Sequence, residues 1–487
     1  MGRESRGHES RESENRTFRL VCGEAEIPAV ERLLRVQGYE FRPLPFDPFA
    51  RELLAEPFPL GTSFALRFGR IYIQDRSSML PPLALAPPSG AGVLDMCSAP
   101  GSKTGMLSRM VGPDGFVLAS EPSAERVGIL RMNLRRYNAA NVGTVRSPAQ
   151  DLSLSAGRWT HIQLDPPCSG WGTLNRNPGA RELWSGDKLP PLIALQKTLL
   201  TKAASLLAPG GVVVYSTCTT NVQENEEQVR WAMDNLGLVP ESLERPQGFT
   251  FETPLLPGMD GVLRVADDSL GQGFFLARLR RPGALPHDVL TGAGAHDCAR
   301  PGAKNALGSL PGAPLDRERL PAMQGAGPMA VESLPPGMLY ESRGTLFFLH
   351  QGLLPCVEQG LRVRGFPLGR CKTLESRGGG RPGSKKMGGK KAGKGRKNGG
   401  AGGMNDRARF QVDPTARALM PSVQEAGPAA VQVDDAASLE ALLQGRSLTA
   451  ASADAKGPAP LYFDDMPLGW LTRKGKRLLW PEKSMIS

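Results

Sequence analysis

The clearest pattern along the chain is a series of short apolar runs separated by segments with helical spacing. The runs are GVLDMC, GFVLAS, NVGTV, THIQLD and GGVVVYS, and they lie between residues 92 and 216. The segments between them place apolar residues at helical spacing around Met106, over 124–137 and over 192–207. Near-continuous apolar strands that alternate with helices are typical of βαβ units. The pattern therefore predicts an α/β fold with a mostly parallel, doubly wound sheet, which we place at residues 81–280.

A smaller unit is predicted ahead of this sheet. The stretch IPAVERLLRVQGY has its apolar residues at helical spacing, and SFALRFGRIYIQDRSSMLPPLAL has strand character followed by a turn and a helix. We expect residues 17–80 to form an N-terminal subdomain. Residues 1–16 are polar and charged throughout, so we expect a disordered tail there.

The C-terminal half changes character several times. Pro and Gly recur without periodicity over residues 281–330, which predicts a linker. Strand character returns over 331–374, as in GTLFFLH, and indicates a C-terminal α/β module. The segment 375–405 is rich in Gly and Lys and has too little apolar surface to offset the entropy of ordering, so it predicts disorder. Residues 406–487 have globular composition again.

Composition and charge narrow the functional class. A chain of 487 residues is too long for one core. Its 59 Lys and Arg against 48 Asp and Glu give a formal charge of +11, which favours a polyanionic partner such as nucleic acid, although part of the charge lies in 375–405. No apolar run approaches the roughly 20 residues that span a bilayer. The seven cysteines form no Cys-x-x-Cys pair, so we expect no metal site and a cytoplasmic location.

Polar residues follow three of the predicted strands in a way that suggests a nucleoside ligand. The first strand runs into DMCSAPGSKT, a turn whose backbone can approach a ligand, although it matches neither G-x-G-x-x-G nor the P-loop spacing. Glu121 follows the second strand, where an acid can accept hydrogen bonds from a ribose diol. Asp151 follows the third, within reach of an adenine-sized group. These residues fit S-adenosylmethionine, unless the two acids are merely solvated loop residues.

Two cysteines follow the next two strands. Cys168 comes directly after Asp165-Pro166-Pro167, and Cys218 ends the run VVVYSTC. An aromatic residue after Asp-Pro-Pro would resemble the motif of amino-group methyltransferases, but Cys168 stands in its place. A single thiol is usually a small buried hydrophobe. Two thiols at neighbouring strand ends, one beside a carboxylate, favour chemistry instead.

The blocks DMCSAPGSKT, LDPPCSGWG and YSTCTTNVQENE together resemble the signature of the RNA (cytosine-5) methyltransferases of the Nol1/Nop2/Sun family, over about residues 60–280. The stretches YIQDRSSMLPPLAL and DMPLGWLTRKGKRL further resemble its bacterial branch that acts on 16S ribosomal RNA, the methyltransferase F type. The resemblance implies a Rossmann-like class I methyltransferase domain at 81–280 and a PUA-like RNA-binding domain at 406–487. Two positions depart from the family pattern: Pro166 replaces a small residue, and Ser102 replaces a second Gly.

The resemblance also implies roles for the two thiols. C5 of cytosine becomes nucleophilic only after a thiolate adds to C6. In similar proteins the attacking thiol is that of the Tyr-Ser-Thr-Cys block, here Cys218, and the other thiol, here Cys168, assists release of the covalent adduct. Asp165 would bind the N3 and amino edge of the base, for which its carboxyl must be protonated or share a proton.

The cofactor residues follow in the same way. By resemblance, the turn lines S-adenosylmethionine with Asp165 at the same edge, Glu121 binds the ribose and Asp151 lies near the adenine. The turn consists of Cys97, Ser98, Ala99, Pro100, Gly101, Ser102 and Lys103. Lys103 either helps to lower a thiol pKa or is an exposed lysine at a helix start. Arg126 either supports the cofactor site or is a solvated helical residue.

Basic residues next to aromatic ones suggest surfaces for RNA. The candidates are RRY at 135–137, GWGTLNRNP at 170–178, and Trp470 with Arg473, Lys474, Lys476 and Arg477. Trp171 and Trp184 could equally be core residues. The acids that follow Cys218 are expected to be solvated or paired with Arg230. We assign RNA binding to the N-terminal subdomain and the PUA-like domain of a monomer.

Three other functions are compatible with parts of this pattern. The catalytic blocks do not distinguish ribosomal RNA from transfer RNA. A noncatalytic RNA-binding ribosome-assembly factor could keep the fold, although retention of both Cys168 and Cys218 speaks against it. In DNA methylation the thiol after Asp-Pro-Pro would be expected to attack.

Overall fold

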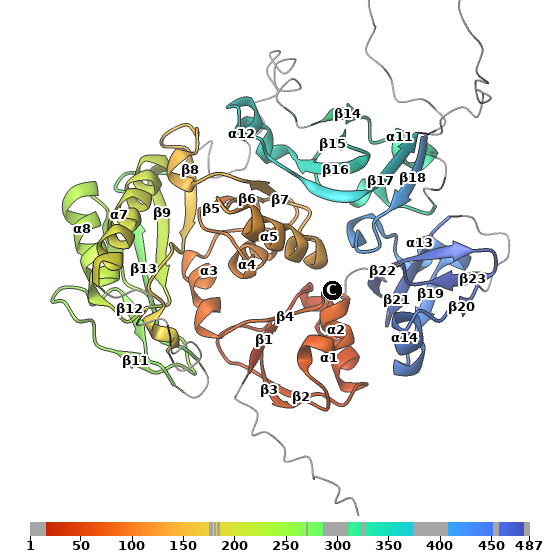
Figure 1. Cartoon of the computed structure of the whole chain (residues 1–487), viewed down its shortest axis with the longest axis horizontal. Coiled ribbons are helices and arrows are strands. Elements are labelled where there is room, and N and C mark those ends of the chain that lie inside the picture. The colour runs from red at the N-terminus through yellow and green to blue at the C-terminus, as the bar shows by residue number, and fades with distance from the viewer. Residues whose placement is uncertain are drawn as a thin grey trace, which may run out of the picture.

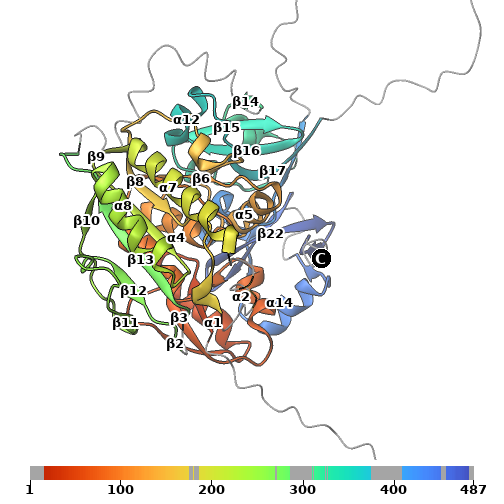
Figure 2. The same cartoon turned by 60° about the vertical axis from the view of Figure 1, so that its left-hand side comes forward.

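The computed structural model describes residues 16–174, 186–268, 271–285, 312–323, 327–373, 408–450 and 457–481, with single positions 179, 182, 310 and 325. The tail at 1–15, the segment 375–405 and Trp184 lie outside the described residues, as do parts of the expected linker. Four sheets form the described structure, and three smaller ones lie around the largest (Figures 1 and 2).

The N-terminal sheet has four strands in the order β2-β3-β1-β4, and all neighbours are antiparallel. Its strands are β1 (Thr17–Leu20), β2 (Glu40–Pro43), β3 (Ala50–Ala55) and β4 (Ile71–Ile73). The helix α1 (Ile27–Arg35) buries Val30, Leu33 and Leu34, the i, i+3, i+4 spacing of an amphipathic helix. The short helix α2 (Phe64–Arg67) begins at Ser63, whose hydroxyl caps it.

The central sheet has nine strands and contains the predicted parallel core. Five strands are parallel, in the spatial order β9-β8-β5-β6-β7, and four short or antiparallel strands extend the β9 edge. The parallel strands are β5 (Gly92–Asp95), β6 (Phe116–Ser120), β7 (Val142–Val145), β8 (Trp159–Leu164) and β9 (Leu207–Thr217), and the others are β10 (Val239–Glu241), β11 (Phe251–Glu252), β12 (Leu263–Val265) and β13 (Phe274–Arg280). The predicted doubly wound α/β domain is therefore confirmed.

Helices cover both faces of this sheet, because its strands are apolar on both sides. They are α3 (Leu80–Leu85), α4 (Ser102–Val111), α5 (Ala124–Tyr137), α7 (Leu189–Leu206) and α8 (Glu226–Leu236). In Figure 1, α4 and α5 lie beside β5 to β7, whereas α7 and α8 lie beside β8 and β9. The packing of these helices on the sheet gives two core clusters. One contains Leu94, Ile162 and Tyr215, and the other contains Val93 and Val117.

The third sheet corrects two predicted boundaries. Its order is β14-β15-β16-β17-β18, with the strands β14 (Ala313–Leu315), β15 (Gly337–Ser342), β16 (Thr345–His350), β17 (Phe366–Thr373) and β18 (Ala408–Val412). β14 and α11 (Arg319–Ala322) lie within the expected linker, where β14 pairs with β15 and Leu320 is buried. β18 belongs to this sheet and not to the last domain, because residues 408–412 pair with β17 across the Gly/Lys segment. The helix α12 (Leu354–Glu358) follows β16.

The fourth sheet joins the C-terminal residues to the N-terminal subdomain. Its strands are β19 (Val431–Val433), β20 (Leu448–Thr449), β21 (Ala459–Phe463), β22 (Met466–Lys474) and β23 (Arg477–Leu479), with helices α13 (Val423–Ala426) and α14 (Ala436–Leu443). Its apolar side chains share one core cluster with those of α1 and β1. Trp480 packs edge-on against Phe68 with ring centroids 5.1 Å apart. The buried Arg417 donates to the carbonyls of Phe68 and Arg136 and so ties three units together.

Among the described residues, no helix is long and apolar enough to cross a membrane. The same residues contain no group of three or more His, Cys, Asp or Glu side chains placed to hold a metal ion.

Candidate active site

The predicted site residues follow the carboxyl ends of five adjacent parallel strands. β5 leads into the turn at 97–103, β6 into Glu121, β7 toward Asp151, β8 into Asp165 and Cys168, and β9 into Cys218. The chain runs outward from β5 to β7 and then returns to the other side of β5 with β8. Ligands of such sheets bind where the strand order reverses, at the carboxyl ends of the strands. That place lies between β5 and β8.

The turn after β5 is fixed on both sides by hydrogen bonds. The Ser98 backbone N–H donates to the Ser120 carbonyl of β6 at 3.1 Å, and Asn133 of α5 donates to the Pro100 carbonyl at 2.8 Å. Gly101 has φ +105°, and a Cβ there would approach Leu130 Cδ1 to 3.0 Å. Gly is required at this position for both reasons. The backbone of the turn is therefore held in place before any ligand binds.

The acids after β6 and β7 differ in their surroundings. The Glu121 side chain is 2% exposed, accepts from the Ser123 N–H at 2.9 Å and lies 3.5 Å from Arg126. Arg126 also donates to the Ala99 carbonyl at 2.8 Å, so it supports the turn after β5 although half of it is exposed. Asp151 ends a short 3₁₀ helix (Ala149–Asp151) and is exposed.

Lys103 and Asp165 form an ion pair between the turn and the end of β8. Lys103 Nζ lies 2.7 Å from Asp165 Oδ2, and the Ser216 hydroxyl donates to Asp165 Oδ1 at 2.8 Å. The Lys103 side chain is only 11% exposed, so the alternative of an exposed helix-start lysine is wrong. Burial lowers the pKa of Lys103, but Asp165, together with Cys218 and Asp95, raises it, and the net shift is upward. Lys103 therefore carries a fixed positive charge in the site.

The two thiols lie against each other. Cys168 Sγ and Cys218 Sγ are 3.2 Å apart, although 50 residues separate them in the chain. The hydrogen bond from Cys168 lowers the pKa of Cys218, and Lys103 lowers it further, while burial and Asp165 act in the opposite direction. The same hydrogen bond and burial raise the pKa of Cys168. Cys218 is thus the thiol that ionises first, and its thiolate would accept the hydrogen bond that the two sulfur atoms share.

A buried carboxylate holds the two thiol-bearing loops together. Glu224 has no exposed surface, and it accepts hydrogen bonds from the Ser169 backbone N–H at 2.9 Å, from the Ser169 hydroxyl and from Gln196 at 3.0 Å. The Tyr215 hydroxyl donates to its backbone carbonyl at 2.7 Å. Ser169 follows Cys168, whereas Glu224 follows Cys218, so the network spans both loops.

The acids after Cys218 correct one prediction in part: Glu227 is exposed as expected, but Glu224 and Glu226 are buried. We expected them to be solvated or paired with Arg230. Glu226 is also fully buried and forms an ion pair with Arg264 at 3.0 Å. Arg230 instead donates to the Pro257 carbonyl. Buried acids need such partners, because an unpaired buried charge is very costly.

Two glycines in contact form a second link between the loops. The Gly172 N–H donates to the Cys218 carbonyl at 3.0 Å, and the Gly273 N–H donates to the Gly172 carbonyl at 3.0 Å. A Cβ on Gly172 would lie 2.2 Å from the Gly273 carbonyl oxygen. Gly172 is therefore required by close backbone contact, which a single sequence does not reveal.

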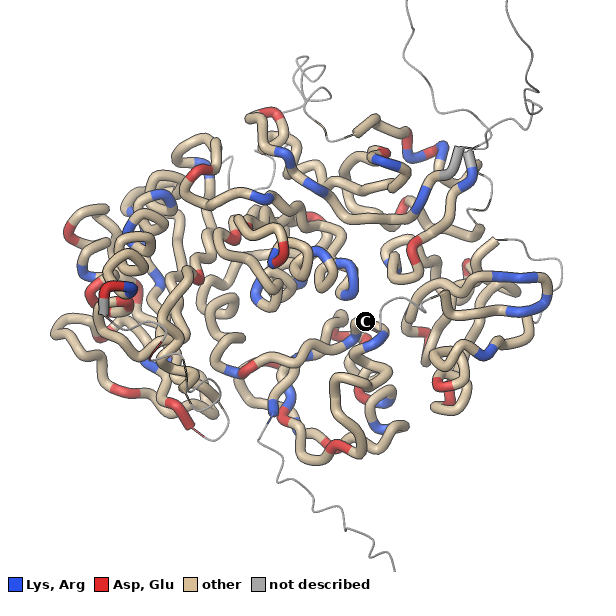
Figure 3. The backbone as a smooth tube through the Cα atoms, viewed as in Figure 1, with Lys and Arg blue, Asp and Glu red and all other residues tan. Residues whose placement is uncertain are grey.

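The predicted RNA surfaces are only partly exposed. Trp470 is 1% exposed and its indole N–H donates to the Ala416 carbonyl at 2.9 Å, so it is a core residue and the predicted stacking role is wrong. Tyr137 is also buried, where it packs against Arg19 and Tyr72. Trp171 is half-buried. Lys474, Lys476 and Arg477 remain exposed on the β22–β23 hairpin, where Figure 3 shows a basic strip.

Sequence reasoning also missed two buried side chains behind the cofactor turn. Asp95, the last residue of β5, is 1% exposed and accepts from the Thr104 hydroxyl at 2.6 Å; burial raises its pKa to about 6. Arg19 reaches from the N-terminal subdomain and donates to the Ser102 carbonyl at 3.2 Å. Asp95 ends an apolar run, and this position was the signal in the sequence that could have indicated a buried acid. Nothing in the sequence marks Arg19.

Comparisons with known proteins give the relatives of this chain. Residues 82–280 match the family described as 16S rRNA methyltransferase RsmB/F. The ribosomal RNA small subunit methyltransferase F of Cronobacter sakazakii is 36% identical over 283 residues, which cover 55% of this chain and 58% of that protein. The protein of the same name from Pectobacterium atrosepticum is 32% identical over 289 residues, which cover 56% of this chain and 57% of that protein. The chain thus spans little more than half the length of these relatives.

One solved structure, a methyltransferase homologue from Pyrococcus horikoshii, is 32% identical; the match covers 55% of this chain and 86% of that one, with a TM-score of 0.48. The family expected from the three sequence blocks is confirmed. Through residues 82–280, the chain belongs to the RsmB/F family of 16S rRNA methyltransferases.

Proposed function

We propose that this protein makes 5-methylcytosine in RNA, with ribosomal RNA as its substrate and S-adenosylmethionine as the methyl donor. The observation that carries this proposal is the thiol pair of Cys168 and Cys218, 3.2 Å apart beside the Lys103–Asp165 ion pair. Cytosine C5 needs a thiolate at C6 before it can attack a methyl group. The reaction also needs a second group that removes the C5 proton afterwards. A site with one ionisable thiol and one thiol that keeps its proton supplies both the nucleophile and this second group.

Cys218 is the nucleophile in this proposal. The Cys168 S–H donates to the Cys218 sulfur and stabilises its thiolate, and Lys103 adds a positive charge. The thiolate forms a bond to C6 of cytosine, and the ring becomes an enamine with electron density at C5. The Cys218 sulfur leaves again when the C6 bond breaks.

Asp165 and Lys103 act on the edge of the base. The Asp165 carboxylate can accept from the cytosine amino group while Lys103 stays hydrogen-bonded to it. As the thiolate adds to C6, negative charge develops at N3 and O2, which Lys103 can stabilise. Lys103 thus supplies the hydrogen-bond donor at this edge of the base, and Asp165 supplies the acceptor.

Cys168 has its role after methyl transfer. The proton on C5 must leave before the C6–S bond can break, and a base must accept it. Cys168 keeps its own proton in the resting site, because its pKa is raised. It must therefore first release this proton to solvent, which becomes easier once the Cys218 sulfur is bonded to carbon and no longer accepts the Cys168 hydrogen bond. The thiolate of Cys168 then takes the C5 proton.

The residues around the turn fit an adenosine cofactor. The carboxylate of Glu121 has acceptor sites left beside those used by Ser123 and Arg126, which suits a ribose diol. The exposed Asp151 carboxylate makes no side-chain hydrogen bond within the described part of the chain, and it suits the adenine amino group. Ser98, Gly101 and Lys103 line the methionine side. S-adenosylmethionine supplies an electrophilic methyl group when it is bound.

The choice of ribosomal RNA rests on the relatives and on charge. The printed names of the relatives refer to ribosomal RNA of the small subunit. The net charge of +11 suits a polyanion. A base inside a duplex cannot reach the thiols, so the target cytosine must be single-stranded or flipped out.

The test is methylation of purified RNA by the full chain with labelled S-adenosylmethionine, followed by bisulfite sequencing. We expect 5-methylcytosine in small-subunit ribosomal RNA and no label in transfer RNA. A Cys218→Ala variant should give no label in either. Label in transfer RNA alone would show that transfer RNA, and not ribosomal RNA, is the substrate. 5-Methylcytosine formed by the Cys218→Ala variant would overturn the mechanism. A wild-type chain that binds RNA without labelling it would favour a noncatalytic assembly factor.

A further inference from the structure

A pocket of about 510 Å³ lies between the catalytic sheet and the third sheet, away from the thiol pair. The helix α5 and the strand β7 form one wall, and β17, β18 and the residues before β17 form the other. Thr144 and Arg364 join the two walls, because each backbone N–H donates to the other's carbonyl at 2.9 Å. The pocket is thus built by residues that lie more than 200 positions apart.

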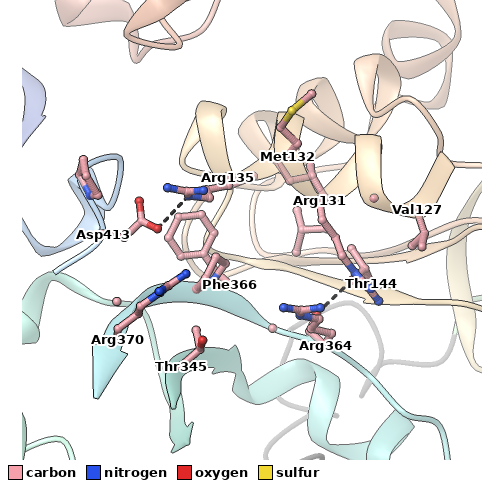
Figure 4. Close-up of a pocket in the computed structure, with 18 of the residues that line it drawn as sticks. Val127, Arg131, Met132, Arg135, Thr144, Thr345, Arg364, Phe366, Arg370 and Asp413 are labelled. Atoms are coloured by element: carbon pink, nitrogen blue, oxygen red, sulfur yellow. Dashed lines mark hydrogen bonds and ion pairs between the residues drawn. The ribbon is translucent and has the colours of Figure 1, made fainter. Parts of the chain in front are cut away.

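Four guanidinium groups line this pocket: those of Arg131, Arg135, Arg364 and Arg370 (Figure 4). Asp413 is the single acidic residue in the lining, and it lies 2.8 Å from Arg135. Within the described residues, no carboxylate pairs with any of the other three arginines. The pocket therefore carries an excess of positive charge.

Two of the arginines, Arg131 and Arg364, are held in place by uncharged contacts. Arg131 donates from Nε to the Thr144 hydroxyl at 2.8 Å, and the Arg364 guanidinium lies 4.9 Å from the Phe347 ring centroid. Burial, followed by the nearby Arg364, lowers the pKa of Arg131 to about 10. Like charges brought together in this way are destabilising by themselves, and an anion between them would offset that cost.

The lining favours a phosphate group over a nucleobase. Phe366 is 3% exposed, so its ring offers little surface for stacking. The remaining lining is largely small or aliphatic and includes Gly128, Gly365 and Gly369. Arginines at fixed positions bind phosphate oxygens with paired hydrogen bonds.

We propose that this pocket, at the junction of α5 and the third sheet, binds a backbone phosphate of the RNA substrate at a nucleotide other than the target cytosine. The proposal rests on the proposed function, because it takes RNA to be the substrate. Contacts to phosphates fix the position of a nucleic acid without reading its sequence. The pocket therefore acts as an anchor that aligns the RNA, while the thiol pair acts on one base.

The main test compares two double variants of the full chain. Arg364→Gln with Arg370→Gln removes two charges from the pocket. Arg343→Gln with Arg362→Gln removes two exposed charges from the same module outside the lining. RNA affinity is measured over a range of salt concentrations, and thermal melting checks folding. We expect the pocket variant to bind RNA about 10-fold more weakly at moderate salt, with a log-log salt slope shallower by about 0.7, the value for one phosphate of a single strand. The control should match the wild type.

A change of opposite sign guards against a folding artefact. Asp413→Asn removes the only acid of the lining and keeps an oxygen for Thr415, from which Asp413 accepts. We expect this variant to bind RNA more tightly and with a steeper salt slope. A destabilised variant cannot produce that result. Weaker or unchanged binding would contradict the proposal.

Two further results separate the possible occupants. Equal losses of RNA affinity in both double variants would show that only net charge matters and would overturn the proposal that this pocket binds a phosphate. Unchanged RNA affinity, with loss only of stabilisation by inorganic phosphate, would indicate a free-anion site. If the pocket variant lost methylation only on an assembled ribosomal subunit, the occupant of the pocket would be an acidic protein of that subunit. If the wild type binds no RNA, both proposals fail; if it methylates RNA and the pocket variant binds it normally, only this one fails.

Discussion

The loops after β8 and β9 each present a cysteine to the same site, yet the two thiols have opposite properties. Cys218 has a lowered pKa and Cys168 a raised one, although their sulfur atoms are 3.2 Å apart and both are half-buried. The difference arises from charge, because Lys103 favours the Cys218 thiolate. A thiolate at Cys218 can only accept the hydrogen bond that the two sulfur atoms share.

This comparison explains why two cysteines of the same chemistry take different parts in one reaction. A thiolate attacks and a thiol does not, so the neighbours of each sulfur decide its role. Asp165 opposes ionisation of both thiols, while its partner Lys103 opposes that effect at Cys218. The following predictions are arranged from the largest expected effect to the smallest, and each acts on one side of this comparison.

Loss of the nucleophile should have the largest effect. We expect Cys218→Ser to lower the rate of methylation by about 10,000-fold, because a hydroxyl in this position remains protonated at neutral pH. Single-turnover transfer of labelled methyl groups to RNA measures it. Cys371→Ser, at a buried cysteine of β17, is the matched control and should keep nearly full activity. Comparable losses in both variants would remove the distinction between the thiols.

Loss of the charge beside Cys218 should have the next largest effect. Lys103→Met leaves Asp165 without its ion-pair partner and raises the pKa of Cys218, since Lys103 is one of the groups that lower it. We expect a rate about 100-fold lower at neutral pH. The rate should also require a higher pH to reach its plateau, because the Cys218 thiolate forms only at a higher pH. Lys197→Met on α7 is the control, and an unshifted pH profile in Lys103→Met would contradict this account.

Loss of the carboxylate that joins the loops should affect geometry more than chemistry. Glu224→Gln replaces an acceptor oxygen by an amide that cannot accept from the Ser169 hydroxyl and Asn221. We expect the free energy of unfolding to fall by about 2 kcal/mol, measured by urea denaturation. The Cys218 thiolate should still form, so the pH profile should keep its midpoint. Glu227→Gln, one turn along and exposed, should have no measurable effect.

A change on the cofactor side should have the smallest effect and should leave the two thiols unlike each other. Arg126→Gln removes the hydrogen bond to the Ala99 carbonyl and the contact with Glu121. Because Arg126 is half exposed, we expect only about a three-fold rise in the KM for S-adenosylmethionine. A fall in kcat at saturating cofactor would mean that Arg126 acts on the reaction itself.

The central fold could be predicted because its signals are local. All five apolar runs became parallel strands, and Glu121, Asp165, Cys168 and Cys218 followed strand ends as expected. Strands buried on both faces leave a continuous apolar pattern in the sequence. The order of the blocks also identified the family. That the thiols touch was not predictable, because it depends on how β8 and β9 are paired.

The failures concern burial and long-range pairing. Trp470 and Tyr137 are amphipathic side chains that serve equally well in a core or at a surface, and neighbouring positive charges made them resemble an RNA surface. Glu224 lies in a polar run, and only the folded loops provide its partners. β14 and β18 pair with strands that a loop or the 375–405 segment separates from them, so composition alone could not assign them.

The most direct test of the central claim is the mass of the protein after incubation with a cytosine-containing RNA fragment and S-adenosylmethionine. The Cys168→Ala variant should accumulate a species heavier by the methylated RNA, with the bond mapped to Cys218 by proteolysis, because the C5 proton is no longer removed. The variant with both cysteines replaced by Ala should form none. A covalent species in a variant that lacks only Cys218 would contradict the assignment of the two thiols.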